Sequence, residues 1–92
     1  MGYEVLTEWS GNVVKWLFRY SITRSEVALK AGISETYLIK ALHDTNPYVS
    51  SCKKIDSSVA KCLEDRGFES RSYLQIQGKA RKKLPNMPKK LL

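Results

Sequence analysis

The chain has 92 residues, enough for one small domain with a single core. No apolar stretch approaches the ~20 residues of a membrane-spanning helix, and the N-terminus lacks the basic and apolar segments of a secretory signal. The net charge of +7 lies in residues 71–92, which hold seven basic residues and no acid, because residues 1–70 hold nine basic and nine acidic residues. A basic segment on a neutral globule predicts a polyanionic partner, with a solvated tail as the alternative.

The first helix is expected to begin near residue 7 or residue 11, with Ser10 or Asn12 as its cap. Gly11 argues against a continuous helix through this point, and residues 3–9 also alternate like a strand. Further along, apolar side chains recur at helical spacing up to the end of the helix: Val13, Trp16, Leu17 and Tyr20.

The next segment carries the local signals of two short helices, 23–31 and 34–43, joined by a tight turn. Thr23 and Glu26 have the spacing of a capping box, Gly32 permits positive φ in the turn, and Ser34 can cap the second helix. With Gly32 in the turn, small and apolar residues point inward: Val27, Ala28, Ala31, Ile33, Leu38 and Ala41. A small residue such as Ala28 is needed where two helices cross closely. The pattern predicts a helix-turn-helix whose second helix is shaped to enter a DNA major groove.

Asn46-Pro47 breaks the chain, and a stripe of apolar residues then predicts a helix to about Arg66, either continuous or interrupted near residues 56–58. Gly67 closes this helix, and Phe68 is expected to fold back on the core. Cys52 and Cys62 are ten residues apart, about 15 Å along one helix, too far for a disulfide. We expect buried thiols in a reducing compartment, and their spacing does not suit zinc.

Residues 71–78 contain β-favouring residues that alternate between two faces, and we expect a strand here. A single strand needs a partner, which residues 3–9 or the same strand in a second copy could supply. The strand is therefore predicted to mediate dimerisation, with the helix that ends at Gly67 as the alternative contact. Residues 79–92 are rich in Lys and Arg and are expected to form a basic flexible arm.

The segment ITRSEVALKAGISETYLIKALHDTNP resembles the λ-repressor-like family, the Cro and Xre group of phage and bacterial regulators. The matching positions are Thr23, Ala28, Gly32-Ile33-Ser34, Tyr37-Leu38 and Asn46-Pro47. The lac-repressor headpiece is a weaker match, because Tyr37-Leu38-Ile39 stands where that family has Thr-Val-Ser. The resemblance covers roughly residues 12–68 and implies a mainly α domain of four to five helices, which we expect over residues 1–70. The strand (71–78) and the arm (79–92) lie outside the resemblance.

The resemblance also implies roles for individual residues. Those expected to face base edges are Ser34, Glu35, Thr36, Lys40 and His43. Those expected to contact phosphates are Arg24, Tyr37, Thr45 and Asn46. The charge of the arm, and not the resemblance, adds four further expected phosphate contacts, Lys79, Arg81, Lys82 and Lys83. Glu35 has an alternative role in stabilising the helix dipole, and His43 has one in bonding a free carbonyl at the helix end.

These features predict a sequence-specific regulator that binds double-stranded DNA, working as a homodimeric repressor on a pseudo-palindromic operator. Its expected location is the cytoplasm of a bacterial or phage-infected cell, at the nucleoid. We expect no catalytic site, cofactor, metal, membrane contact or small-molecule effector, since no pattern for one is present. The alternative is a protein-interaction module, such as a phage-type inhibitor, whose basic arm binds an acidic protein or a nucleic-acid-binding cleft.

Overall fold

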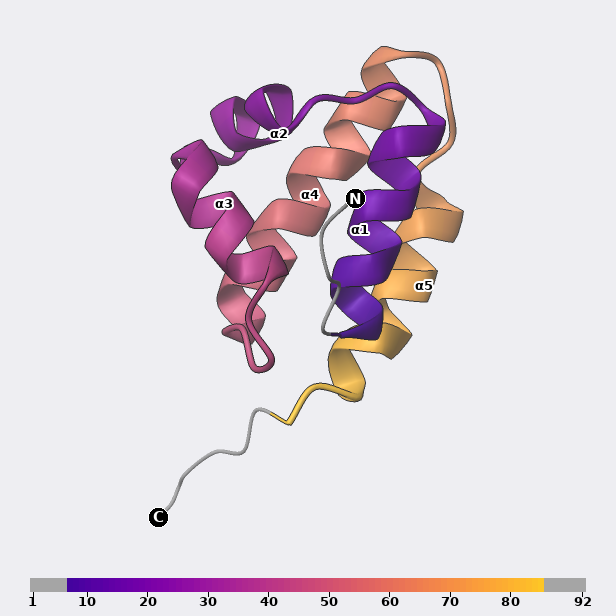
Figure 1. The fold of residues 1–92 in the computed structure, drawn as a ribbon. Coiled ribbons are helices and arrows are strands. Elements are labelled where there is room, and N and C mark those ends of the chain that lie inside the picture. Colours follow the sequence, from indigo (N-terminus) through magenta and orange to yellow (C-terminus); the bar gives the residue numbers. More distant parts are fainter. Residues whose placement is uncertain (1–6, 86–92) are drawn as a thin grey trace.

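A computed structural model describes residues 7–85, which form five helices: α1 (Glu8–Arg19), α2 (Arg24–Ala31), α3 (Glu35–Leu42), α4 (Val49–Asp65) and α5 (Arg71–Lys82). The mainly α class and the count of up to five helices are confirmed, and the described part of the chain contains no strand. Helix α4 lies in the middle, with α2 and α3 on one side of it and α1 and α5 on the other (Figure 1). Helix α2 packs chiefly against α4, whereas α5 packs against α4 and α1.

The first helix begins at the earlier of its two expected positions. The Thr7 hydroxyl accepts a hydrogen bond from the Ser10 N–H at 2.9 Å, so Thr7 is the cap and the expectation of Ser10 or Asn12 is wrong. Gly11 lies inside the helix, because Trp9 and Val13 on either side of it are fully buried and their packing outweighs its low helix propensity. The strand alternative fails at Trp9, and residues 3–6 lie outside the described part of the chain.

The predicted boundaries of the next three helices are confirmed to within one or two residues. Thr23 and Ser34 cap α2 and α3, and Gly32 ends α2 with a φ of +72°. Helix α4 is continuous, and Gly67 follows it with a φ of +83°. Phe68 then turns back so that its ring lies 4.7 Å from the ring of Tyr20, although about half of its side chain stays exposed.

The expected strand at 71–78 is wrong, because these residues form most of α5. Tyr73, Gln77 and Ala80 are buried, and their spacing of four and three residues is the helical period. In this short window the alternation of side chains imitated a strand. The segment forms a helix because a helix makes its backbone hydrogen bonds internally and buries this stripe against α1 and α4.

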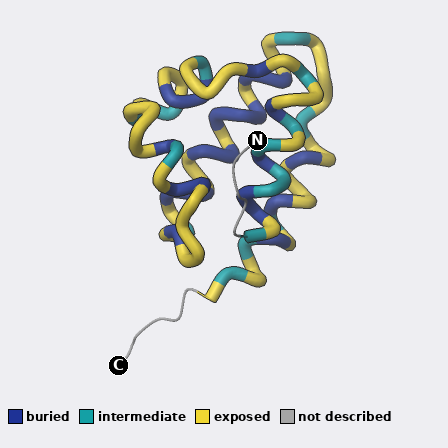
Figure 2. The backbone as a smooth tube through the Cα atoms, in the orientation of Figure 1, coloured by how far each residue is buried: buried dark blue, intermediate teal, exposed yellow. Residues whose placement is uncertain are grey.

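The core is continuous through all five helices, as the buried inner sides of the helices in Figure 2 indicate. Its largest fully buried side chains include Trp9, Tyr73, Leu38, Leu42 and Ile55. Since α5 contributes to this core, the domain does not end at residue 70. The platform that carries α2 and α3 therefore depends on both ends of the described chain.

Candidate nucleic-acid interface

Helix α3 has one buried side and one exposed side (Figure 2). Leu38 and Leu42 are buried, and Ala41 lies beside them against the core. The predicted base-reading residues are all exposed: Ser34 and Glu35 at the start of the helix, Thr36 and Lys40 along it, and His43 at its end. The structure therefore gathers these five residues along one exposed helix and its caps.

Short polar bonds hold the α2–α3 pair in place. The Ser34 hydroxyl accepts from the Tyr37 N–H at 3.0 Å, and the Thr23 hydroxyl accepts from the Glu26 N–H at 3.0 Å. The Ser58 hydroxyl of α4 donates to the Val27 carbonyl at 2.6 Å, which joins α2 to the central helix. Such local and long-range bonds fix the position of α2 and α3 on the rest of the fold.

A capping box predicts two hydrogen bonds at the start of α2. The one accepted by the Thr23 hydroxyl is present, but the Glu26 side chain bonds elsewhere. The Glu26 carboxylate pairs with the Arg66 guanidinium through two hydrogen bonds, at 2.7 and 2.9 Å. These bonds lower the pKa of Glu26 and raise the pKa of Arg66. The pair fastens the first turn of α2 to the end of α4.

Helix α3 is also joined to the start of α4 by a side-chain contact. The hydroxyls of Tyr37 and Ser51 lie 2.6 Å apart, close enough for a hydrogen bond. Between these helices lies a pocket of about 240 Å³, to which Lys40 and Tyr48 also contribute. The predicted phosphate contact of Tyr37 therefore belongs to a hydroxyl that already has a neighbour within the protein.

The other predicted phosphate residues of the first 70 positions flank α3. Arg24 is exposed at the first position of α2, and Thr45 and Asn46 are exposed in the connection between α3 and α4. The Asn46 N–H donates to the Asp44 carboxylate at 2.9 Å, which gives this connection a fixed turn. The cation of Arg24 therefore precedes α3 in the chain, and the polar side chains of Thr45 and Asn46 follow it.

The predicted basic arm divides into residues with different surroundings. Residues 79–82 belong to α5, so the expectation of a flexible arm is wrong for them, while residues 86–92 lie outside the described part of the chain. Lys79 and Lys82 are exposed, whereas Lys83 pairs with Glu8 at 3.0 Å. Arg81 turns inward and forms an ion pair with Asp56, so its guanidinium already has an acidic partner within the protein.

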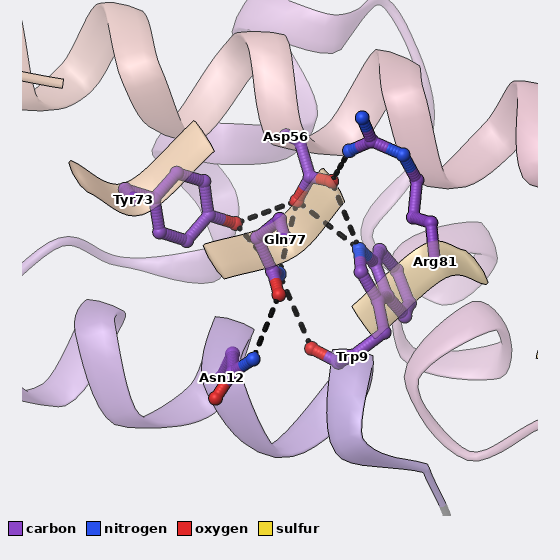
Figure 3. Close-up of polar contacts among 6 residues, drawn as sticks. All are labelled: Trp9, Asn12, Asp56, Tyr73, Gln77 and Arg81. Carbon is purple, nitrogen blue, oxygen red and sulfur yellow. Dashed lines mark hydrogen bonds and ion pairs between the residues drawn. The ribbon is translucent and has the colours of Figure 1, made fainter. Parts of the chain in front are cut away.

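Asp56 is the centre of a buried polar network that the sequence analysis did not identify (Figure 3). Its carboxylate accepts from the indole N–H of Trp9 at 3.0 and 3.1 Å, the Tyr73 hydroxyl at 2.7 Å and the Gln77 amide at 3.1 Å. The Arg81 guanidinium forms an ion pair with the same carboxylate. The Asp56 side chain is only 1 % exposed, so these donors replace the water it has lost.

The network has a definite electrostatic balance. Burial raises the pKa of Asp56, and hydrogen bonds from Tyr73 and Trp9 and the charge of Arg81 act in the opposite direction. Burial, together with the neighbouring Asp56 charge, also raises the pKa of Tyr73 well above its ordinary value. The network joins α1, α4 and α5 through one buried carboxylate.

One signal in the sequence was available for this network. Asp56 lies four residues after Cys52 and three before Val59, inside the apolar stripe of α4. A charged residue on such a stripe is buried only with partners. The identity of those partners was not available, because Trp9 and Gln77 are far from Asp56 in sequence.

The remaining titratable core groups are the two cysteines. Cys52 and Cys62 are buried and unbridged, which agrees with the predicted reading of both as small buried hydrophobes. Burial raises the pKa of Cys52 to about 12 and also raises that of Cys62, so both thiols are poor nucleophiles. Within residues 7–85 no group of His, Cys, Asp and Glu is arranged to hold a metal ion.

None of the helices in this same part of the chain has the length and apolar character needed to cross a bilayer. Comparison with known proteins gave no match to a protein-family model, a curated protein or a solved structure.

Proposed function

We propose that this protein is a sequence-specific regulator that binds double-stranded DNA, with α3 in the major groove. The observation that carries the proposal is the exposed side of α3, held on a packed platform and carrying donors and acceptors at consecutive turns. Lys40 can donate to guanine O6 and N7, Glu35 can accept from cytosine N4, and the Thr36 methyl can contact a thymine methyl. Arg24, Thr45 and Asn46 would then position the helix through phosphate contacts.

We further propose that the protein acts as a homodimeric repressor on a pseudo-palindromic operator. A single small domain makes few base contacts, and two-fold repetition is the usual source of additional specificity. The setting proposed with this function is the cytoplasm of a bacterial or phage-infected cell, at the nucleoid. Occupation of a promoter by the dimer would be sufficient for repression.

A protein-interaction module is the second candidate, and the exposed apolar residues favour it. Phe18 is 88 % exposed on α1 and Leu29 is 82 % exposed on α2. Contiguous apolar patches at a surface mark sites that bind other proteins, and these two side chains are the candidates for such a patch. Under this candidate, Phe18→Ser and Leu29→Ser would abolish complex formation, and substitutions on α3 would not.

The deciding experiment is selection of bound sites from a random duplex library, followed by substitutions. Lys40→Ala should reduce discrimination between the selected site and a one-base variant by about 1–3 kcal/mol, whereas Arg24→Ala should weaken binding to all duplexes alike. Lys61→Ala, which removes an exposed cation from α4, is the matched control. A library that shows no enriched site, or a Lys40 variant with unchanged preference, contradicts the proposal.

A further inference from the structure

A groove lies between the start of α4 and the second half of α5. It has a volume of about 630 Å³ and is lined by Lys53 of α4 and by Gln75, Gly78, Lys79, Arg81 and Lys82 of α5. Gly78 lines the groove with backbone only, because it has no side chain. No acidic residue lines it.

The charge of this groove comes from three lysines, one from α4 and two from α5. Arg81 also reaches the groove, but its charge is offset by the buried Asp56 carboxylate. Across residues 7–85, Lys53, Lys79 and Lys82 take part in none of the ion pairs, whereas Lys30, Arg66, Arg71, Arg81 and Lys83 each have an acidic partner. Three exposed and unpaired lysines around one concave surface form an attractive site for phosphate groups.

The position of the groove relates it to the proposed DNA-binding helix. The end of α3, the start of α4 and the end of α5 lie at the same end of the molecule (Figure 1). The connection that carries Thr45 and Asn46 leads directly into α4, whose second turn contains Lys53. The first two turns of α4 therefore link this connection to the groove.

We propose that the α4–α5 groove binds the sugar–phosphate backbone of the DNA duplex, as a second contact outside the helix that reads bases. The inference rests on the proposed function and adds Lys53 to it, a residue that no sequence motif indicated. Lysine contacts of this kind neutralise phosphates without reading bases. The groove therefore contributes affinity that depends on salt, and it does not change which site is preferred.

The test compares two triple variants of the full chain with the same loss of charge. The groove variant carries Lys53→Gln, Lys79→Gln and Lys82→Gln, and the control carries Arg19→Gln, Lys61→Gln and Arg71→Gln, all at exposed positions. Affinity for a duplex of random sequence is measured over a range of salt concentrations. Each neutralised phosphate contributes about 0.9 to the slope of log affinity against log salt, so the groove variant should lose roughly 2–3 units of slope and the control less than about 1.

A cross-linking measurement locates the contact and does not depend on the triple variant folding. Because Cys52 and Cys62 are buried, a photoreactive label attaches selectively to Lys79→Cys or to the control Lys61→Cys. We expect cross-links to duplex DNA from position 79 and none from position 61.

The outcomes separate this inference from the proposed function. An unchanged slope in the groove variant, an equal loss in the control, or no cross-link from position 79 overturns the groove. If the proposed function is wrong, selection from the random duplex library instead yields no enriched site. Site preference that is retained while the slope falls supports both.

Discussion

At the scale of single residues, Glu26 and Arg66 illustrate how one side chain can serve a different role from the one its motif suggests. The spacing from Thr23 predicts that Glu26 returns a bond to the helix cap, yet its carboxylate binds a guanidinium 40 residues away. The guanidinium is a stronger partner than a neutral N–H, because both groups are charged and the bond is bidentate. This contact ties the proposed DNA-binding helices to the end of α4.

The pair makes a prediction for the dependence of stability on pH. The Arg66 guanidinium lowers the pKa of Glu26 in the folded chain, so the folded state binds fewer protons there than the unfolded state. The stabilisation is present above the ordinary pKa of a glutamate, and it is lost as the pH falls through the lowered value. Chemical denaturation of Glu26→Gln between about pH 7 and pH 3 should therefore show a flatter loss of stability than the parent chain.

The matched control for this measurement is Glu35→Gln, which removes an exposed carboxylate from α3. If both variants give the same pH profile as the parent, the Glu26–Arg66 pair does not contribute to stability. If Glu35→Gln flattens the profile as much as Glu26→Gln, the effect belongs to net charge and not to the pair.

At the scale of elements, α5 contains basic residues that the structure assigns to opposite environments. Arg81 is 19 % exposed and pairs with Asp56, whereas the adjacent Lys82 is exposed at the groove. The separation follows from helical geometry, because Arg81 lies four residues after Gln77 on the side that faces α4, and Lys82 is rotated away by about 100°. Two adjacent residues of α5 thus provide one cation that pairs within the core and one that is exposed to a partner.

Neutralising these two cations should have opposite consequences. Arg81→Gln leaves the Asp56 carboxylate buried without its cation, and we expect a loss of about 3–5 kcal/mol in the free energy of unfolding. Lys82→Gln should leave that free energy within about 0.5 kcal/mol of the parent value, as is usual for surface substitutions. Urea denaturation followed by circular dichroism measures both values.

Salt-dependent DNA binding completes the comparison. We expect Lys82→Gln to reduce the salt slope by about 0.9 if it neutralises one phosphate. Equal stability of the two variants would show that the Asp56 network contributes little, and the role of α5 would then have to be revised.

At the scale of the whole molecule, the core includes helices from both ends of the described chain. Helix α5 covers Trp9 and Asp56 and supplies three of the side chains that bond this carboxylate, Tyr73, Gln77 and Arg81. We therefore expect residues 7–85 to unfold as one cooperative unit. A division at residue 70 would expose the inner surfaces of α1 and α4.

Truncation tests this unity. A chain that ends at residue 70 should lose cooperative thermal unfolding, because Asp56 would keep only the Trp9 indole as a donor and the apolar surface beneath α5 would be exposed. A chain that ends at residue 85 should unfold like the full chain. Circular dichroism melts of both truncations make the comparison, and a cooperative melt of the shorter chain would contradict it.

Local patterns in the sequence are sufficient to place the α2–α3 pair and the end of α4, but they leave open whether α4 continues through residues 56–58. Caps such as Thr23 and Ser34, the glycine at position 32 and the apolar stripe of α4 act within a few residues of one another, so local rules are sufficient to place them. The exposed side of α3 follows from the same periodicity. Local periodicity is therefore sufficient to place the candidate base-reading residues at the surface.

The secondary structure of residues 71–85, and the partners of their charged side chains, depend on tertiary packing. A window of eight residues with alternating side chains fits a strand as well as a helix, and the choice depends on which surface is available to bury Tyr73 and Gln77. The partner of Arg81 is a carboxylate 25 residues earlier, and Lys53 meets Lys79 and Lys82 only because α4 and α5 pack together. Burial and charge pairing between distant segments depend on packing, which no local pattern encodes.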